Sequence, residues 1–176
     1  MDYPDGMQRR PATVQETKAL GHPLRVRIVR LCRERELTNK QLADRLGKDP
    51  GTVLYHVRQL VTAGLLEQAP VRTGPSGALE KPYRTVVDTW WLDGPLNDSE
   101  PDTAFAPIEA FQQELRDAGP ESVRNFSRFV LHLSAEDVAE LDRRILAVLD
   151  DYIETDGERA DRPALGGIFI LHQLAE

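Results

Sequence analysis

The stretch Asp49–Leu60, DPGTVLYHVRQL, decides the fold of the first half of the chain. Asp49 is a suitable helix N-cap, and Pro50 suits the first helical position, where an N–H would have no partner. Two stripes follow at helical spacing. The apolar stripe is Val53, Val57 and Leu60, and the polar stripe is Thr52, Tyr55, His56 and Gln59. This pattern predicts a helix that rests on a core and presents a second, polar face.

A second helix precedes this stretch at a very short distance. Thr38 and Gln41 have the spacing of a capping box, and Leu37 and Leu42 that of a hydrophobic staple. Gly47 is expected to end this helix in a left-handed conformation. Only Gly47 and Lys48 separate the two helices, so they must cross steeply, as in a helix-turn-helix.

The flanking residues extend the motif on both sides. Upstream, we expect a helix over 13–20 and another from Pro23, whose apolar stripe includes Cys32 as a small buried side chain. Downstream of Gly64, the β-prone runs LLEQAPVRT (65–73) and KPYRTVVDTW (81–90) flank the loop GPSGALE. A hairpin after a helix-turn-helix predicts a winged helix.

The segments LGHPLRVRIVRLC, LTNKQLADRLG and TVLYHVRQLVTAGLLE resemble the winged-helix transcriptional regulators of the ArsR type. The resemblance covers about residues 14–87. It implies a repressor that binds double-stranded DNA at a palindromic operator as a homodimer. The single cysteine, which can form no internal disulfide, favours the reducing cytoplasm. The C-terminal half resembles, less specifically, the extensions of some actinobacterial members.

The polar stripe is the predicted reading face for the major groove. Other basic residues are expected to meet phosphates, and the hairpin is expected to follow the DNA backbone or an adjacent minor groove. The predicted DNA-binding residues are Lys40, Lys48, Thr52, Tyr55, His56, Arg58, Gln59, Arg72, Lys81 and Arg84. For His56, a phosphate or base contact competes with packing inside the motif, and a metal-binding or catalytic role is a remote alternative.

The charge of the chain differs between its halves. Residues 1–87 hold 15 Lys and Arg against 9 Asp and Glu, a net charge of +6, whereas residues 88–176 hold 7 against 20, a net −13. This asymmetry favours a polyanion-binding first half and an acidic second half. An alternative function is a winged-helix protein-interaction module that docks partners through its acidic half.

We expect an α+β protein, in which an N-terminal winged helix-turn-helix domain is followed by a smaller α/β dimerisation or effector region. The predicted boundaries are a disordered segment 1–12, the DNA-binding domain 13–94, a linker 95–107 and a C-terminal region 108–176. That region should contain a helix ending at Gly119, a long helix over Ala135–Thr155, and two β-prone runs, SRFVLHLS and LGGIFILHQL, that could pair in one small sheet. The long helix is expected to bury Val138, Leu141, Ile145, Val148, Leu149 and Tyr152. The C-terminal region could dimerise, bind a small-molecule effector, or both.

Other functional classes find little support in the sequence. The single cysteine permits no internal disulfide and no thiolate cluster, and His132 and His172 lack helical metal-ligand spacing, so we expect no metal site. No nucleophile elbow, phosphate-binding glycine loop or HExxH motif is present, so we expect no enzyme and no cofactor. No apolar run approaches the ~18 residues of a membrane helix, and the first residues lack the apolar core of a secretory signal. Trp90, Trp91 and Phe105 either line an apolar pocket or pack a hinge or dimer interface.

Overall fold

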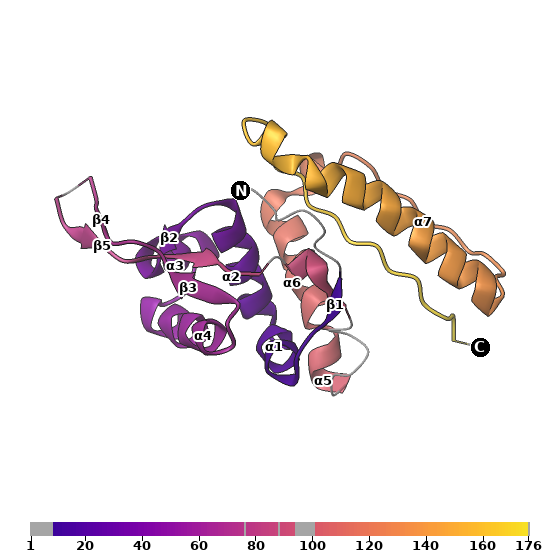
Figure 1. Cartoon of the computed structure of the whole chain (residues 1–176), viewed down its shortest axis with the longest axis horizontal. Helices are drawn as coiled ribbons and strands as arrows, with labels where there is room; N and C mark the ends of the chain where they lie inside the picture. The colour runs from indigo at the N-terminus through magenta and orange to yellow at the C-terminus, as the bar shows by residue number, and fades with distance from the viewer. Residues whose placement is uncertain (1–8, 76, 88, 94–100, 176) are drawn as a thin grey trace. The chain divides into compact units, whose positions relative to one another are not determined.

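The computed structural model describes residues 9–75, 77–87, 89–93 and 101–175, coloured along the chain in Figure 1. The chain divides into two units with a boundary between Pro120 and Glu121, which we call the N-terminal and the C-terminal unit. The predicted boundary was placed earlier, at a linker over 95–107. Residues 94–100 of that linker lie outside the described residues, and most of the rest of it is helical.

Four helices form the first part of the N-terminal unit: α1 (Val14–Leu20), α2 (Pro23–Glu34), α3 (Asn39–Leu46) and α4 (Pro50–Thr62). Their starts agree with the sequence. Thr13 and Thr38 each complete a capping box, and the Asp49 carboxylate accepts hydrogen bonds from the backbone N–H groups of Gly51 and Thr52 at 2.8 and 3.1 Å. Gly47, with φ +60°, ends α3 in the left-handed conformation that favours glycine. The predicted helix-turn-helix is confirmed.

The core of this unit is built from the apolar stripes of α2, α3 and α4. Its completely buried side chains, at 0% exposure, are Ile28, Leu42, Val53, Val57, Leu60 and Leu65. Cys32 lies among them at 2% exposure, and burial raises the pKa of its thiol to about 12. The cysteine is therefore a buried hydrophobic residue, as predicted.

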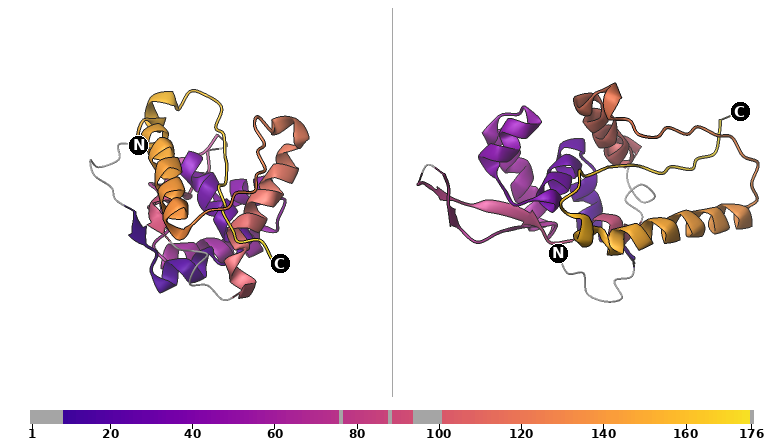
Figure 2. Two further views of the ribbon diagram at one scale, coloured as in Figure 1. Left: turned by 90° about the vertical axis from the view of Figure 1, so that its right-hand side faces the viewer. Right: turned by 90° about the horizontal axis from the view of Figure 1, so that it is seen from above.

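A three-stranded antiparallel sheet completes the winged helix, in the order β2 (Leu37–Thr38), β6 (Pro82–Thr85), β3 (Leu66–Gln68). Farther out, β4 (Arg72–Thr73) pairs with β5 (Leu79–Glu80) to form the end of the wing. The wing projects away from the helices (Figures 1 and 2). At its base, the hydroxyl of Thr85 donates to the carbonyl of Val29 at 3.1 Å, which ties the sheet to α2.

The described chain begins with a short strand inside the segment 1–12, for which the sequence predicted disorder. Strand β1 (Arg10–Pro11) pairs in parallel with β7 (Leu92–Asp93), which follows the 3-10 turn η1 (Thr89–Trp91). Arg10 also forms two hydrogen bonds, of 2.6 and 2.9 Å, with the carboxylate of Glu16, which is only 5% exposed. A buried carboxylate holds this segment in place, a role that the sequence alone did not suggest. Residues 1–8 lie outside the described residues.

Helix α6 (Ala106–Ala118), preceded by the short α5 (Pro101–Ala104), packs against α2 in the N-terminal unit. Two ion pairs join the helices: Arg27 to Asp117 at 2.5 Å and Arg30 to Glu114 at 2.7 Å. The predicted helix is present, but its assignment to the C-terminal region was wrong. These ion pairs and the burial of Ala106 and Ala110 attach it to the winged helix instead.

The 3-10 turn η2 (Pro120–Ser122) lies at the boundary between the units, and the C-terminal unit contains α7 (Ala135–Glu154) and the 3-10 turn η3 (Asp156–Arg159). Ser134 and Asp137 form the predicted capping box. The possible sheet is not formed, because the runs 127–134 and 165–174 have no strand pairing in the described residues. The predicted burial of the apolar side chains of α7 was wrong, since none of them is buried. The pattern identified the helix correctly, but the unit leaves its apolar face only partly buried.

Candidate nucleic-acid interface

Helix α4 presents the candidate reading face. Because Val53, Val57 and Leu60 are anchored in the core, the opposite side of the helix points outward. Thr52, Arg58 and Gln59 are exposed, and Tyr55 is 59% exposed. A threonine methyl, a tyrosine ring and a glutamine amide on one exposed helix face can contact the edges of bases in a major groove. The structure therefore brings three of the four predicted reading residues together.

His56, the fourth member of the predicted stripe, lies elsewhere. It is 7% exposed and its ring lies 4.4 Å from that of His22, the N-cap of α2. At 100° per residue, His56 is only about 65° from the mean direction of the three core residues, closer than any other member of its stripe. The prediction that His56 lies on the exposed face was wrong, because residue spacing alone does not show how far the core extends around the helix.

The environment of His56 disfavours a charged ring. Burial lowers the pKa of His56, and the neighbouring His22 and Arg25 lower it further. Burial also lowers the pKa of His22, whose Nδ1 accepts the backbone N–H of Leu24 at 3.1 Å. The Nδ1 atom of His56 has no hydrogen-bond partner among the described residues. The pair is a neutral contact that joins the reading helix to the start of α2.

Two backbone acceptors fix the reading helix at its ends. The side-chain amide of Asn39 donates to the carbonyl of Pro50 at 2.9 Å, across the turn between α3 and α4. At the other end, the amide of Gln15 on α1 donates to the carbonyl of Thr62 at 2.8 Å. Both hydrogen bonds orient α4. Neither was predicted from the sequence, since each joins α4 to a residue on another helix.

The basic residues of the wing are exposed, but its arginines are paired with carboxylates. Arg84 bonds to Glu67 at 2.7 Å, and Arg72 bonds to Glu80 at 3.1 Å. Glu36 lies close to both arginines, 3.8 Å from Arg72 and 4.0 Å from Arg84. Phosphate groups would have to compete with these carboxylates, a restraint that the sequence analysis missed.

The remaining basic candidates surround the reading helix on the surface. Lys40 and Lys48 are exposed, as is Lys81 on the wing. Lys40 has only a loose ion pair with Asp44, at 3.9 Å. Because such exposed pairs contribute little, these lysines can meet phosphates at small cost.

A polar groove lies behind the reading helix, on the side of His56. It is lined by the start of α2, by Lys48, Thr52 and His56, and by the face of α6 that carries Glu109 and Arg116. Arg27 forms part of its wall; it is 9% exposed, and its Nε atom has no partner among the described residues. A ligand here would touch both α6 and the helix that carries the reading face.

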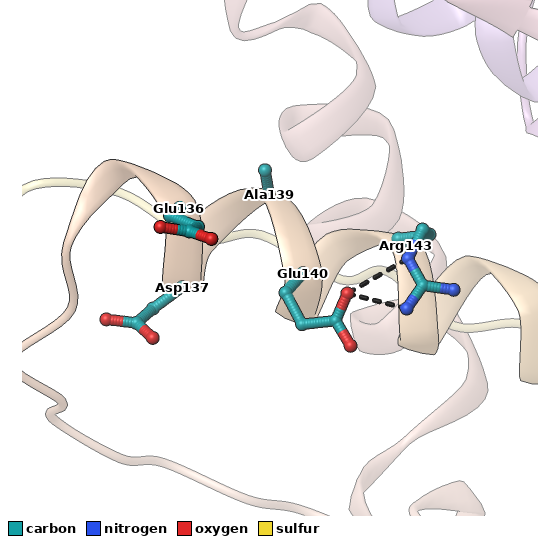
Figure 3. A pocket seen from close by; sticks show the side chains of 5 residues that line it. All are labelled: Glu136, Asp137, Ala139, Glu140 and Arg143. Carbon is teal, nitrogen blue, oxygen red and sulfur yellow. Dashed lines mark hydrogen bonds and ion pairs between the residues drawn. The ribbon is translucent and has the colours of Figure 1, made fainter.

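A second, shallow depression lies on α7 in the C-terminal unit (Figure 3). Its side chains come from one side of a single helix: Glu136, Asp137, Ala139, Glu140 and Arg143. Glu140 accepts two hydrogen bonds from Arg143, which lower the pKa of its carboxyl. This surface has no walls from other elements, and it does not form an enclosed site.

Neither cavity is lined by the aromatic residues that the sequence singled out. Phe105 is 60% exposed, and the guanidinium of Arg9 stacks over the ring of Trp90 at 4.0 Å. In the described part of the chain, no group of three or more His, Cys, Asp or Glu side chains is placed to hold a metal ion. None of the helices described there is both long and apolar enough to cross a membrane.

Comparison with known proteins agrees with this geometry. Residues 20–69 match the family model of a helix-turn-helix domain, and this range contains α2, β2, α3, α4 and β3. A search of curated proteins found no match. The fold is that of an α+β winged helix-turn-helix protein, and the matched domain supports the class of DNA-binding regulators.

Proposed function

We propose that this protein is a sequence-specific transcriptional regulator of the ArsR type that binds a palindromic operator as a homodimer and represses transcription. The observation that carries the proposal is the exposed polar face of α4, which holds Thr52, Tyr55 and Gln59 above a helix-turn-helix core. Gln59 can form two hydrogen bonds with adenine, and the Thr52 methyl can contact a thymine methyl. Repression follows when a bound dimer blocks its own promoter.

The other parts of the proposal concern phosphates, effector and location. Lys40, Lys48 and Arg58 bind phosphates beside the reading helix, and the wing contributes Arg72, Lys81 and Arg84. A small-molecule effector binds the groove between α6 and α4 and thereby changes the orientation of the reading helix. The protein acts in the cytoplasm, without a cofactor and without catalysing a reaction.

The direct test is binding to the DNA upstream of its own gene, measured by gel shift and fluorescence anisotropy across a salt series. We expect affinity to fall steeply with salt, since each phosphate contact releases counterions. Gln59→Ala should relax the preference for the operator by about 1–3 kcal/mol, whereas Arg72→Ala should weaken all sequences alike and reduce the salt slope by about 1. Equal effects of the two changes on every sequence would contradict the division of roles.

The carboxylates of the wing provide a second prediction. Glu36→Gln should strengthen DNA binding several-fold at low salt, because it removes a negative charge that lies within 4.0 Å of both Arg72 and Arg84. The matched control is Glu34→Gln, two residues away, whose carboxylate pairs with Arg30 on α2 and not with the wing. If both changes strengthen binding equally, the effect is one of net charge and not of the wing.

A winged-helix protein-interaction module remains the alternative function. The acidic C-terminal half, with its net charge of −13 over residues 88–176, is the observation that favours it. In that case no duplex would shift in gels at low salt, and pull-downs with residues 121–176 deleted would lose a partner that the full chain retains.

A further inference from the structure

The C-terminal unit exposes an unusual amount of apolar surface. Of the 23 large apolar side chains that are exposed in the described residues, 15 lie between Val123 and Leu174. The other eight are scattered over the N-terminal unit, which has a complete core of its own. A segment of this size without buried side chains cannot offset the entropy of ordering its chain. Something outside this unit must therefore cover it.

The two extended runs of this unit also have main chains without strand partners. In Figures 1 and 2, both run in the same direction, opposite to α7, as strands do in a β–α–β unit. Neither pairs with another strand among the described residues. Both are rich in β-branched and aromatic residues: Phe129, Val130, Ile168, Phe169 and Ile170. Their N–H and C=O groups form edges that are suited to pairing with another strand.

We propose that these runs pair with the same runs of a second copy of the chain, in one intermolecular β-sheet covered by the two α7 helices. The proposal rests on the proposed function in one respect, since a palindromic operator requires a dimer. It goes further by assigning the dimer contact to the C-terminal unit and by giving its main-chain geometry.

A second copy fits these surfaces better than another occupant for three reasons. First, an unpaired strand is complementary to itself about a two-fold axis, since each N–H then faces a carbonyl of the copy. Second, the run 165–174 carries no carboxylate, ammonium or guanidinium group, and the run 127–134 carries only Arg128, so identical copies meet there with little charge repulsion. Third, the 15 exposed residues offer on the order of 1,000 Å² of surface, more than the roughly 800 Å² that each partner buries in a stable interface.

The test is sedimentation equilibrium of the full chain, with the variant Val130→Pro and the matched control Val130→Ile. Val130 is 64% exposed, so neither change disturbs the N-terminal core. Proline removes an N–H and should weaken dimerisation roughly a hundredfold, whereas isoleucine keeps the β-branched shape and should leave it unchanged. A wild-type chain that stays monomeric, or a dimer unaffected by Val130→Pro, would overturn the proposal.

A second measurement covers the case in which the proline variant misfolds. Amide hydrogen exchange of the wild type, at two protein concentrations, should show protection of residues 127–134 and 165–174 that increases with concentration. Protection that is the same at both concentrations, or absent, would overturn the pairing. The proposed function fails separately: a dimer with protected strands that binds no DNA contradicts regulation, whereas a DNA-binding dimer that Val130→Pro leaves intact contradicts only this dimer contact.

Discussion

Helices α4 and α7 start with similar caps, but their apolar stripes lie in opposite environments. Each has a side-chain N-cap, Asp49 in one and Ser134 in the other, and each carries an apolar stripe at helical spacing. Helix α4 buries Val53, Val57 and Leu60 completely, whereas α7 buries nothing. Capping and periodicity are local and determine where a helix forms. Burial depends on packing contacts with other segments, and only the N-terminal unit provides such contacts within one chain.

The largest expected difference between the two helices concerns their leucines. Leu60→Ala should lower the free energy of unfolding by about 3 kcal/mol, because it leaves a cavity in a core where Leu60 is 0% exposed. Leu149→Ala on α7 is the matched change at 36% exposure, and it should cost less than about 1 kcal/mol at concentrations too low for dimerisation. Chemical denaturation of both variants measures the difference, and equal losses would remove the contrast.

The buried carboxylate of the N-terminal unit should produce the next largest effect. The guanidinium of Arg10 donates to Glu16 and holds the pKa of its carboxyl at about 2, below its ordinary value of 4.5. The resulting stabilisation is fully present above pH 4.5 and is lost as the pH falls toward 2, since the unfolded chain then binds the proton first.

Glu16→Gln should therefore lower the free energy of unfolding by about 2 kcal/mol at pH 7 and flatten the acid part of the stability curve. This value allows for solvent screening, because the Arg10 side chain is 45% exposed. The control is Glu140→Gln on α7, which also breaks pairs with arginines, but at a more exposed site, where 41% of the Glu140 side chain is exposed against 6% for Glu16. Acid titration of stability by circular dichroism compares the two. An acid curve for Glu16→Gln that matches the wild type would contradict the role of the buried pair.

The smallest expected effect concerns the histidine pair. Burial lowers the pKa of both His22 and His56, so the unfolded chain binds protons more readily near the ordinary value of 6.5. Stability should be greatest above pH 6.5 and should fall as the pH drops below it. His56→Phe keeps a ring in place and should weaken this dependence, whereas His172→Gln, at an exposed position, should not. Stronger DNA binding below pH 6.5 would instead indicate that His56 charges and meets phosphate.

The sequence was sufficient for features that depend on neighbouring residues. The caps at Thr38 and Asp49, the left-handed Gly47 and the apolar stripe of α4 were predicted from spacing and confirmed. The outward positions of Tyr55 and Gln59 followed from the same stripe. These features are set within one or two helical turns, so no knowledge of the fold was needed.

The sequence was insufficient wherever distant residues decide the outcome. The carboxylate of Glu36 meets Arg72 and Arg84 only after the hairpin folds back to β2. Strand pairing of the run 127–134 depends on a partner and not on β propensity, which is why its predicted sheet is absent from the described chain. The burial of His56 likewise depends on the position of His22.

The ion pairs between α2 and α6 also have a consequence for the order of folding. Arg30 and Glu114 are 84 residues apart, and Arg27 and Asp117 are 90 apart, whereas the contacts within the helix-turn-helix are local. Loop closure over such a distance costs entropy before any contact repays it, so α6 is expected to dock last and to leave first. The winged helix is thus expected to fold first. Helix α6, which lines one side of the groove, is expected to pack onto it late and to detach while the rest stays folded.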